Sequence, residues 1–153
     1  RNYPSYFFDE IEQPIGEYYP VILTKSSEYN DESNTQNNCV KGYIGRCGSL
    51  IISLRKGNNF SGERATIEYR ITKYRGEVKV ERVQSLGKYN SYLSNEWNDV
   101  LLKLDEKVLS CISNKKFIPV KLNKVCVNGT VMESDSDFDE NGYLYWTYKL
   151  IAR

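Results

Sequence analysis

The sequence contains no histidine, and this absence excludes several kinds of active site at once. Without an imidazole, neither a Ser-His-Asp triad nor a Cys-His pair nor the HExxH zinc motif can be formed. The glycine-rich patterns that bind phosphate groups, GxxxxGK[ST] and GxGxxG, are also missing. We therefore expect a non-enzymatic protein. A hydrolase that uses two carboxylates is an alternative, because any two acidic residues can meet in a folded chain.

Long apolar runs and an excess of one charge are missing as well. No stretch of about 18 apolar residues occurs, so we expect no membrane insertion. The chain carries 21 basic and 20 acidic residues, a formal net charge of +1. Domains that bind nucleic acid usually carry a clear basic excess, so no nucleic-acid partner is expected. The first residues carry no secretory signal, as in a mature chain whose signal was removed or in a trimmed one.

Cysteine is scarce but even in number, with Cys39, Cys47, Cys111 and Cys126. No pair forms a CxxC motif, and four thiolates at these spacings are an unusual zinc site. We predict two disulfides and favour Cys39–Cys47 and Cys111–Cys126 among the three connectivities, because both close short loops. A loop of about 15 residues contributes about 3 kcal/mol of stability. Disulfides imply a periplasmic or secreted protein. Four reduced thiols in a cytosolic protein are the alternative.

The length of 153 residues is typical of one domain with a substantial core, and we predict a single domain over residues 1–153. Within this domain, residues 1–60 are expected to form an N-terminal extension that contains the Cys39–Cys47 disulfide. Residues 61–153 are expected to form the main core.

Three segments of the extension carry a structural signal. Val21-Ile22-Leu23 is its compact apolar piece and predicts a short strand, and Leu50–Arg55 predicts a second strand. The polar stretch Lys25–Asn38 between them is expected to be an exposed loop.

A hairpin is predicted from Arg64 onward. Apolar and polar residues alternate over residues 65–72, a period of two that is typical of a half-buried strand. Tyr74-Arg75-Gly76 predicts a turn, and residues 78–83 predict the returning strand. The alternation changes phase after Val80, which indicates a bulge near Glu81-Arg82.

A helix is predicted over Ser94–Asn114, after a loop at residues 86–92. Ser94 is expected to cap the first turn with its side chain. The helix carries one apolar stripe at helical spacing: Trp97, Val100, Leu101, Leu104, Val108 and Ile112. This stripe is typical of a helix that packs on a sheet.

The C-terminal third predicts extended structure. Phe117-Ile118-Pro119-Val120 ends the helix, Asn128-Gly129 is a turn signal, residues 133–142 form an acidic loop, and residues 143–151 predict a final strand. The order strand, strand, helix, strand predicts an α+β fold, an antiparallel sheet with one main helix packed on one face.

Residues 64–151 resemble the C-terminal domain of the TonB/TolA family. The matching features are the turn glycine Gly76, then Val78, Val83 and Ser85 at the family's spacing, the helix, and the exit at residues 117–120. The resemblance implies a TonB/TolA-like core at residues 61–153. It also implies a periplasmic domain that receives a partner strand at the edge of its sheet.

Partner-binding residues are predicted in two places. The final strand presents one aromatic and polar face, formed by Tyr143, Tyr145, Thr147 and Lys149. The acidic loop is expected to contact a basic partner through Asp135, Asp137, Asp139 and Glu140. This loop fits the EF-hand pattern poorly, because Glu140 and Trp146 stand where glycine and glutamate are required. No metal and no cofactor are therefore predicted.

Two functions follow as hypotheses. The first is a periplasmic protein-binding domain that docks an envelope protein by strand addition at its sheet edge. The alternative is a periplasmic immunity or inhibitor protein that neutralises a bacteriocin or a cell-wall hydrolase. The partner's identity and the oligomeric state stay open.

Overall fold

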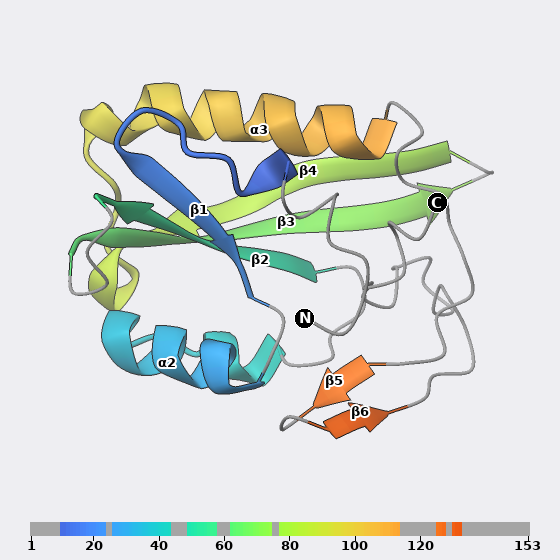
Figure 1. Cartoon of the computed structure of the whole chain (residues 1–153), viewed down its shortest axis with the longest axis horizontal. Coiled ribbons are helices and arrows are strands. Elements are labelled where there is room, and N and C mark those ends of the chain that lie inside the picture. The colour runs from blue at the N-terminus through green and yellow to red at the C-terminus, as the bar shows by residue number, and fades with distance from the viewer. Residues whose placement is uncertain are drawn as a thin grey trace.

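The computed structural model of the chain describes residues 10–23, 26–43, 49–57, 62–74, 77–113, 125–127 and 130–132. Four strands form the main sheet: β1 (Tyr18–Ile22), β2 (Ser49–Lys56), β3 (Arg64–Tyr74) and β4 (Glu77–Leu86). They are antiparallel and lie in the order β1-β2-β3-β4 (Figure 1). With the main helix on one face, this arrangement confirms the predicted α+β fold.

The sheet takes strands from both predicted parts of the chain. β1 and β2 come from residues 1–60, and they agree with the strands expected at Val21-Ile22-Leu23 and Leu50–Arg55. β2 pairs with β3 over seven residues, from Ser49 opposite Arg70 to Arg55 opposite Arg64. The N-terminal part is thus built into the sheet and supplies its first two strands.

The predicted amphipathic helix is present as α3 (Asn98–Ser113), preceded by the short helix η3 (Asn95–Trp97). Its stripe, including Trp97, Leu104 and Val108, is buried against the apolar face of β2 and β3. Burial of each large apolar side chain contributes about 1.5–3 kcal/mol, so this layer is the main core. The expected Ser94 side-chain cap is wrong. The Ser94 backbone oxygen accepts from the Trp97 N–H at 3.1 Å instead, and the side chain makes no capping hydrogen bond.

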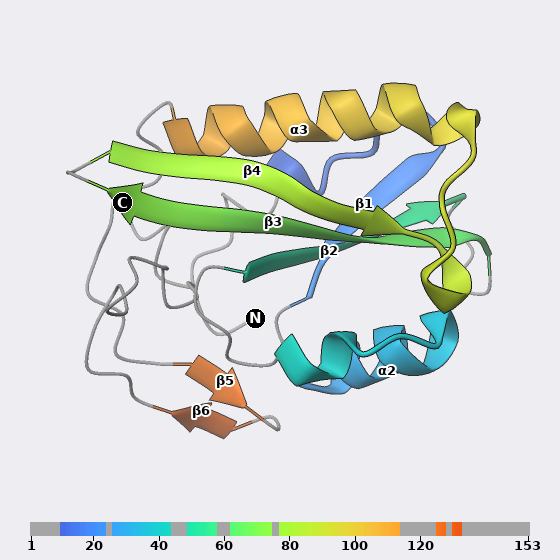
Figure 2. The same cartoon turned by 180° about the vertical axis from the view of Figure 1, so that it is seen from behind.

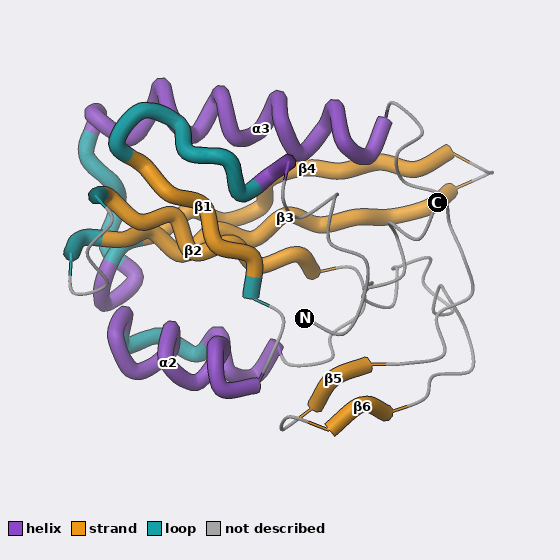
Figure 3. The backbone as a smooth tube through the Cα atoms, in the orientation of Figure 1, coloured by secondary structure: helices purple, strands orange, loops and turns teal. Residues whose placement is uncertain are grey.

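The loop predicted at Lys25–Asn38 is wrong, because Ser26–Gln36 forms the helix α2. α2 covers the sheet face opposite α3, which gives three layers (Figures 2 and 3). Its buried stripe has helical spacing, but three of its four members are polar: Tyr29, Glu32, Ser33 and Gln36. Because hydrophobic periodicity searches for apolar side chains, it cannot detect such a stripe.

The predicted bulge lies in β4. Glu68 pairs with Gln84 and the next residue, Tyr69, pairs with Arg82, so Val83 is the extra residue. A residue inserted in this way bends its strand and increases the local twist. The bulge occurs one residue after the predicted pair Glu81-Arg82.

Four shorter elements complete the described chain, and one of them is the short helix η2 (Lys88–Asn90) between β4 and η3. The short helix η1 (Val40–Tyr43) follows α2 and packs beside it. β5 (Val125–Val127) and β6 (Thr130–Met132) form a separate antiparallel pair, as expected of a hairpin at the predicted Asn128-Gly129 turn. The segments predicted at residues 117–120 and 143–151 lie outside the described residues.

Candidate functional site

The partner-binding residues expected from the sequence lie outside the described residues. They are Tyr143, Tyr145, Thr147 and Lys149 of the final strand, and Asp135, Asp137, Asp139 and Glu140 of the acidic loop. Among the cysteines, Cys39 is exposed, and Cys111 is buried beside the apolar stripe of α3. Cys47 and the side chain of Cys126 are not among the described groups. The two disulfides therefore stay predictions, which a thiol count on the denatured, unreduced protein tests.

The two outer strands of the main sheet differ in length and composition. β1 is five residues long and contains Pro20, which has no N–H to donate to a neighbouring strand. β4 is ten residues long, contains no proline and pairs with β3 on one side. Among the described residues, no strand pairs with its other side. β4 therefore presents the longer row of outward backbone donors and acceptors.

Polar side chains from three elements hold β4 against α3. The Tyr69 hydroxyl of β3 donates to Asp105 Oδ1 of α3, and Arg82 Nε of β4 donates to both oxygens of that carboxylate at 3.0 and 3.2 Å. Arg82 also donates to Ser85 Oγ at 2.8 Å. Burial, followed by the hydrogen bond to Asp105, raises the pKa of Tyr69 far above its ordinary value, so the hydroxyl remains a donor. This network fixes β4 in strand geometry.

A buried polar network joins α2 to the other face of the sheet. Arg64 Nη1 donates to Glu32 Oε1 at 2.8 Å, and their side chains are 3% and 0% exposed. The second carboxylate oxygen of Glu32 accepts from Thr66 Oγ1 at 2.6 Å. Gln36 Nε2 donates to the backbone oxygen of Arg64 at 3.0 Å. Because each group pairs with a group of the other layer, the network holds α2 at one position on the sheet.

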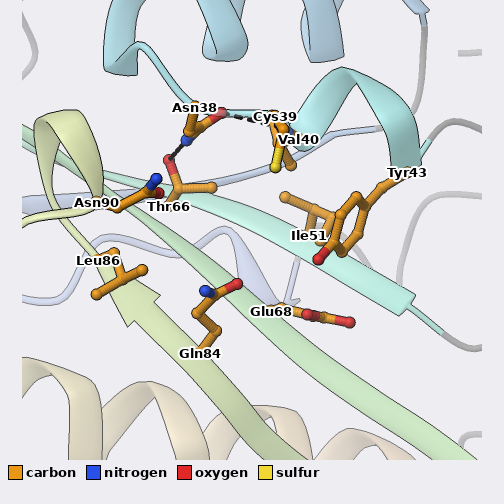
Figure 4. A pocket seen from close by; sticks show the side chains of 10 residues that line it. All are labelled: Asn38, Cys39, Val40, Tyr43, Ile51, Thr66, Glu68, Gln84, Leu86 and Asn90. Carbon is orange, nitrogen blue, oxygen red and sulfur yellow. Dashed lines mark hydrogen bonds between the residues drawn. The ribbon is translucent and has the colours of Figure 1, made fainter.

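A pocket with a volume of about 270 Å³ opens on this face, between η1, the residues that join α2 to η1, strands β2, β3 and β4, and Asn90. We call it the α2-face pocket. Val40, Ile51 and Leu86 supply apolar walls, and Figure 4 shows Tyr43 and Glu68 toward one end with Leu86 and Asn90 at the other. Its polar lining consists of Asn38, Cys39, Tyr43, Thr66, Glu68, Gln84 and Asn90.

Glu68 is the one acidic residue among those that line the α2-face pocket. It is only 5% exposed, and its Oε2 accepts from Ser49 Oγ at 2.9 Å and from Arg70 Nη2 at 3.3 Å. The alternation of β3 places Glu68 on the polar side of the strand together with Thr66 and Arg70, so the sequence offers no reason to select it. The carboxylate is enclosed because η1 and the residues before it pack over this side of the sheet.

The loop between β4 and α3 presents two exposed tyrosines, Tyr89 and Tyr92, and Tyr92 is 94% exposed. Tyr89 and Asn90 have φ angles of 60° and 57°, a left-handed conformation that is rare for a bulky residue such as tyrosine. A second hollow of about 520 Å³ lies between this loop, the end of α2 and the start of β3. Tyrosine is enriched among residues that dominate protein interfaces, so the loop is a second candidate contact surface.

Metal and membrane sites have no support in the described part of the chain. No group of three or more Cys, Asp or Glu residues there is arranged to hold a metal ion. None of the helices described there combines the length and the apolar character needed to span a membrane.

Comparisons with known proteins identify no relative of this chain. No protein-family model, no curated protein and no solved structure matches it. The TonB/TolA resemblance therefore stays a prediction from the sequence.

Proposed function

We propose that this chain is a non-enzymatic protein-binding domain that docks an extended segment of a partner protein along the open side of β4. The observation that carries the proposal is the contrast between the two outer strands. β1 is short and interrupted by Pro20, whereas β4 is twice as long and free of proline. In strand addition, backbone hydrogen bonds supply affinity, so the longer row of donors and acceptors is the better receptor.

The support behind β4 favours this role. β4 is paired with β3 along its length, and Arg82 ties it to Asp105 of α3. A receptor strand that is already ordered does not lose further conformational entropy when a partner docks. The entropy cost of association then falls mainly on the partner segment.

The side chains of β4 also suit selective docking. Lys79 and Glu81 are exposed on one side of the strand, and Val80 is half-buried on the other. Alternating charges of both signs oppose pairing with arbitrary apolar strands, which is how natural edges avoid aggregation. A partner that presents complementary charges meets no such penalty.

The cellular setting of the proposal comes from the sequence. The predicted disulfides favour a periplasmic or secreted protein, and the TonB/TolA resemblance favours an envelope protein as the partner. The resemblance itself implies another receiving edge, the final strand at residues 143–151 with Tyr143, whereas the contrast between the described outer strands favours β4.

Nuclear magnetic resonance titration tests the proposal directly. The probe is an acetylated hexapeptide of alternating threonine and valine with arginine at its fourth position. We expect alternate backbone amides of Glu77–Arg82 to shift, since every second N–H of a strand faces the open side. The amides of β1 serve as the internal control and stay in place. Shifts confined to β1, or no shifts in β4, would contradict strand addition at β4.

Two proline variants sharpen the same test. Along a strand, N–H groups alternate in direction, so of Lys79→Pro and Val80→Pro one removes a donor to β3 and the other removes a donor on the open side. We expect the variant that lacks the donor on the open side to keep most of its thermal stability and to lose its affinity for the peptide. Equal peptide binding by a stable variant of this pair and by the wild type would count against the proposal.

A further inference from the structure

We infer that two copies of this chain pair with each other through β4, antiparallel, about a two-fold axis that passes through Val80. This inference rests on the proposed function for the choice of the edge, and it names a partner, the same edge of a second copy. Self-pairing and the docking of another protein then exclude each other, because both occupy the open side of β4.

The bulge limits where two copies of β4 can pair. Regular pairing is available to residues 77–82, because Val83 is the extra residue of the bulge. In an antiparallel pair, the N–H groups of directly opposite residues point either both toward each other or both away. Since N–H direction alternates along a strand, a strand that pairs with itself must place a residue on the two-fold axis. A centre at Lys79 pairs residues 77–81, a centre at Val80 pairs residues 78–82, and any other centre pairs a shorter stretch.

The charges of β4 select one of these two centres. Lys79 and Glu81 are both exposed, and the alternation of the strand places them on the same side. A centre at Lys79 would set the two Lys79 side chains directly opposite each other, which is destabilising. A centre at Val80 sets Lys79 of each copy opposite Glu81 of the other and gives two attractive pairs. The edge is therefore complementary to itself in one register.

The helix α3 supplies apolar surface beside the same edge. Leu102 and Leu109 are 58% and 50% exposed, and Asp105 between them contacts Arg82 of β4. Residues three and four apart are neighbours on a helix, so both leucines lie on the side of α3 that is turned toward β4 (Figure 2). Directly opposite side chains of an antiparallel pair share one face, so the two α3 helices lie on the same face of the joined sheet. Self-pairing brings the exposed leucines of both copies toward the two-fold axis, where their removal from water is favourable.

The other outer strand explains why assembly stops at two copies. Pairing through β4 leaves β1 as the outer strand at each end of the joined sheet. β1 is short and contains Pro20, so it offers no comparable edge to a third copy. One short strand pair and a few leucines form a small interface, so we expect a weak, reversible dimer that is populated at a protein concentration of roughly 100 µM.

Sedimentation equilibrium and nuclear magnetic resonance at a series of protein concentrations test the inference together. We expect monomers and dimers in exchange, and we expect alternate backbone amides of residues 77–82 to shift as the dimer forms. A chain that is monomeric up to roughly 1 mM overturns the inference, since even weak specific interfaces are populated there. A dimer whose formation leaves these amides in place overturns it as well.

A charge exchange tests the register. Lys79→Glu sets two acidic side chains opposite each other at both pairs, and Glu81→Lys does the same with two basic ones. Each single variant should weaken dimerisation at least about tenfold. The variant that combines both changes restores opposite charges and should dimerise like the wild type. An equal mixture of the two single variants should form mixed dimers for the same reason.

A matched control separates local pairing from net charge. Lys103→Glu makes the same charge change at an exposed position of α3 and should leave dimerisation unchanged. A general field effect would act equally in Lys79→Glu and Lys103→Glu, because it depends on net charge alone. Equal effects of these two variants, or no rescue in the combined variant, would contradict pairing about Val80.

The contribution of α3 has its own control. Leu109→Gln should weaken dimerisation several-fold, because the apolar contact beside the two-fold axis is lost. Tyr92→Gln removes an apolar side chain that is even more exposed, but from the loop before α3, and should have no effect. Equal effects of both variants would show that exposed apolar surface in general drives the association, and this would overturn the inference.

The hexapeptide described above distinguishes this inference from the proposed function. Where both are right, the peptide shifts the β4 amides and dissociates the dimer, and a peptide that binds β4 without dissociating the dimer overturns self-pairing. If the peptide shifts these amides while the chain is monomeric at all concentrations, strand addition stands and self-pairing is wrong. If the chain pairs through β4 but the peptide shifts no amide of residues 77–82, self-pairing stands and the docking of an extended segment is wrong.

Discussion

Individual polar residues hold this protein's layers together. Glu32 and Arg64 pair across the interface of α2 and the sheet with almost no solvent exposure, and Tyr69 reaches Asp105 across the opposite interface. A buried charge is stable only while its partner remains, because the low dielectric of the interior penalises an isolated ion. The Glu32–Arg64 pair therefore fixes the position of α2 on the sheet, whereas the contact of Tyr69 with Asp105 adds to the apolar packing of α3.

Loss of the buried Glu32–Arg64 pair should destabilise the protein more than loss of an exposed charge. Glu32→Ala leaves Arg64 buried without its main counter-ion and should lower the free energy of unfolding by about 3–5 kcal/mol. Asp31 is the matched control, since it contacts the same Arg64 nitrogen at 3.4 Å but its side chain is 62% exposed. Asp31→Ala should cost no more than about 1 kcal/mol. Urea unfolding followed by tryptophan fluorescence measures both, and equal losses would contradict the assigned role of Glu32.

The Tyr69 hydroxyl should stabilise the folded protein in a pH-dependent way. Tyr69→Phe should lower the free energy of unfolding at pH 7 by about 1.5–3 kcal/mol, because a hydrogen bond to a charged group is lost. The folded state raises the pKa of Tyr69, so its protonated hydroxyl stabilises the fold fully below the unfolded value of about 10. Above that pH the unfolded chain releases a proton that the folded chain retains, and this stabilisation declines.

The stability difference between wild type and Tyr69→Phe should therefore narrow as the pH rises from about 9 to about 11. Denaturant unfolding at a series of pH values measures it. A difference that stays constant over this range would show that the hydroxyl does not titrate differently in the folded and unfolded states.

The two helices differ in how well they can be predicted from their sequences. α3 carries an apolar stripe with a period of 3.6 residues, and the predicted helix matches it within a few residues at either end. α2 buries Glu32, Ser33 and Gln36, residues that composition assigns to a loop. Its buried stripe is recognised only when the polar partners on β3 are known. Prediction from the sequence succeeded where burial is apolar and failed where burial is compensated by hydrogen bonds.

Asn30 tests the helical state of α2, because it is exposed in the middle of the helix. Asn30→Ala should stabilise the protein by about 0.5 kcal/mol, and Asn30→Pro should destabilise it by about 3 kcal/mol, as expected at the interior of a helix. Thermal unfolding of the two variants measures the difference. An exposed loop would tolerate both changes, so two unchanged midpoints would contradict the helix.

At the scale of the whole molecule, the sheet unites the two halves of the chain. Leu50, Ile52 and Leu54 of β2 share one apolar core with β3 and α3, although the sequence suggested an extension ending at residue 60. The predicted boundary falls between two strands that are neighbours in the sheet. Separation at this point would expose the long edge of β3 and half of the core.

A fragment of residues 61–153 tests this unity. We expect it to lack a cooperative unfolding transition, because it loses the strand that pairs with β3 and the apolar side chains that strand buries. The full chain should unfold in a single step when fluorescence and circular dichroism are compared. A fragment that unfolds cooperatively would show that residues 61–153 fold without the strands of the N-terminal extension.

Local sequence patterns were sufficient to predict the fold class, the hairpin of β3 and β4 with its bulge, and α3, because these features depend on local alternation and on apolar periodicity. Packing between the layers produced the remaining features. It formed α2 from a polar segment, placed β1 and β2 in the same sheet as β3, and enclosed Glu68 in a pocket beside an open strand. These features depend on which polar groups meet across layers, and such pairings join residues that are about 30 positions apart in the chain, as in Arg64 and Glu32.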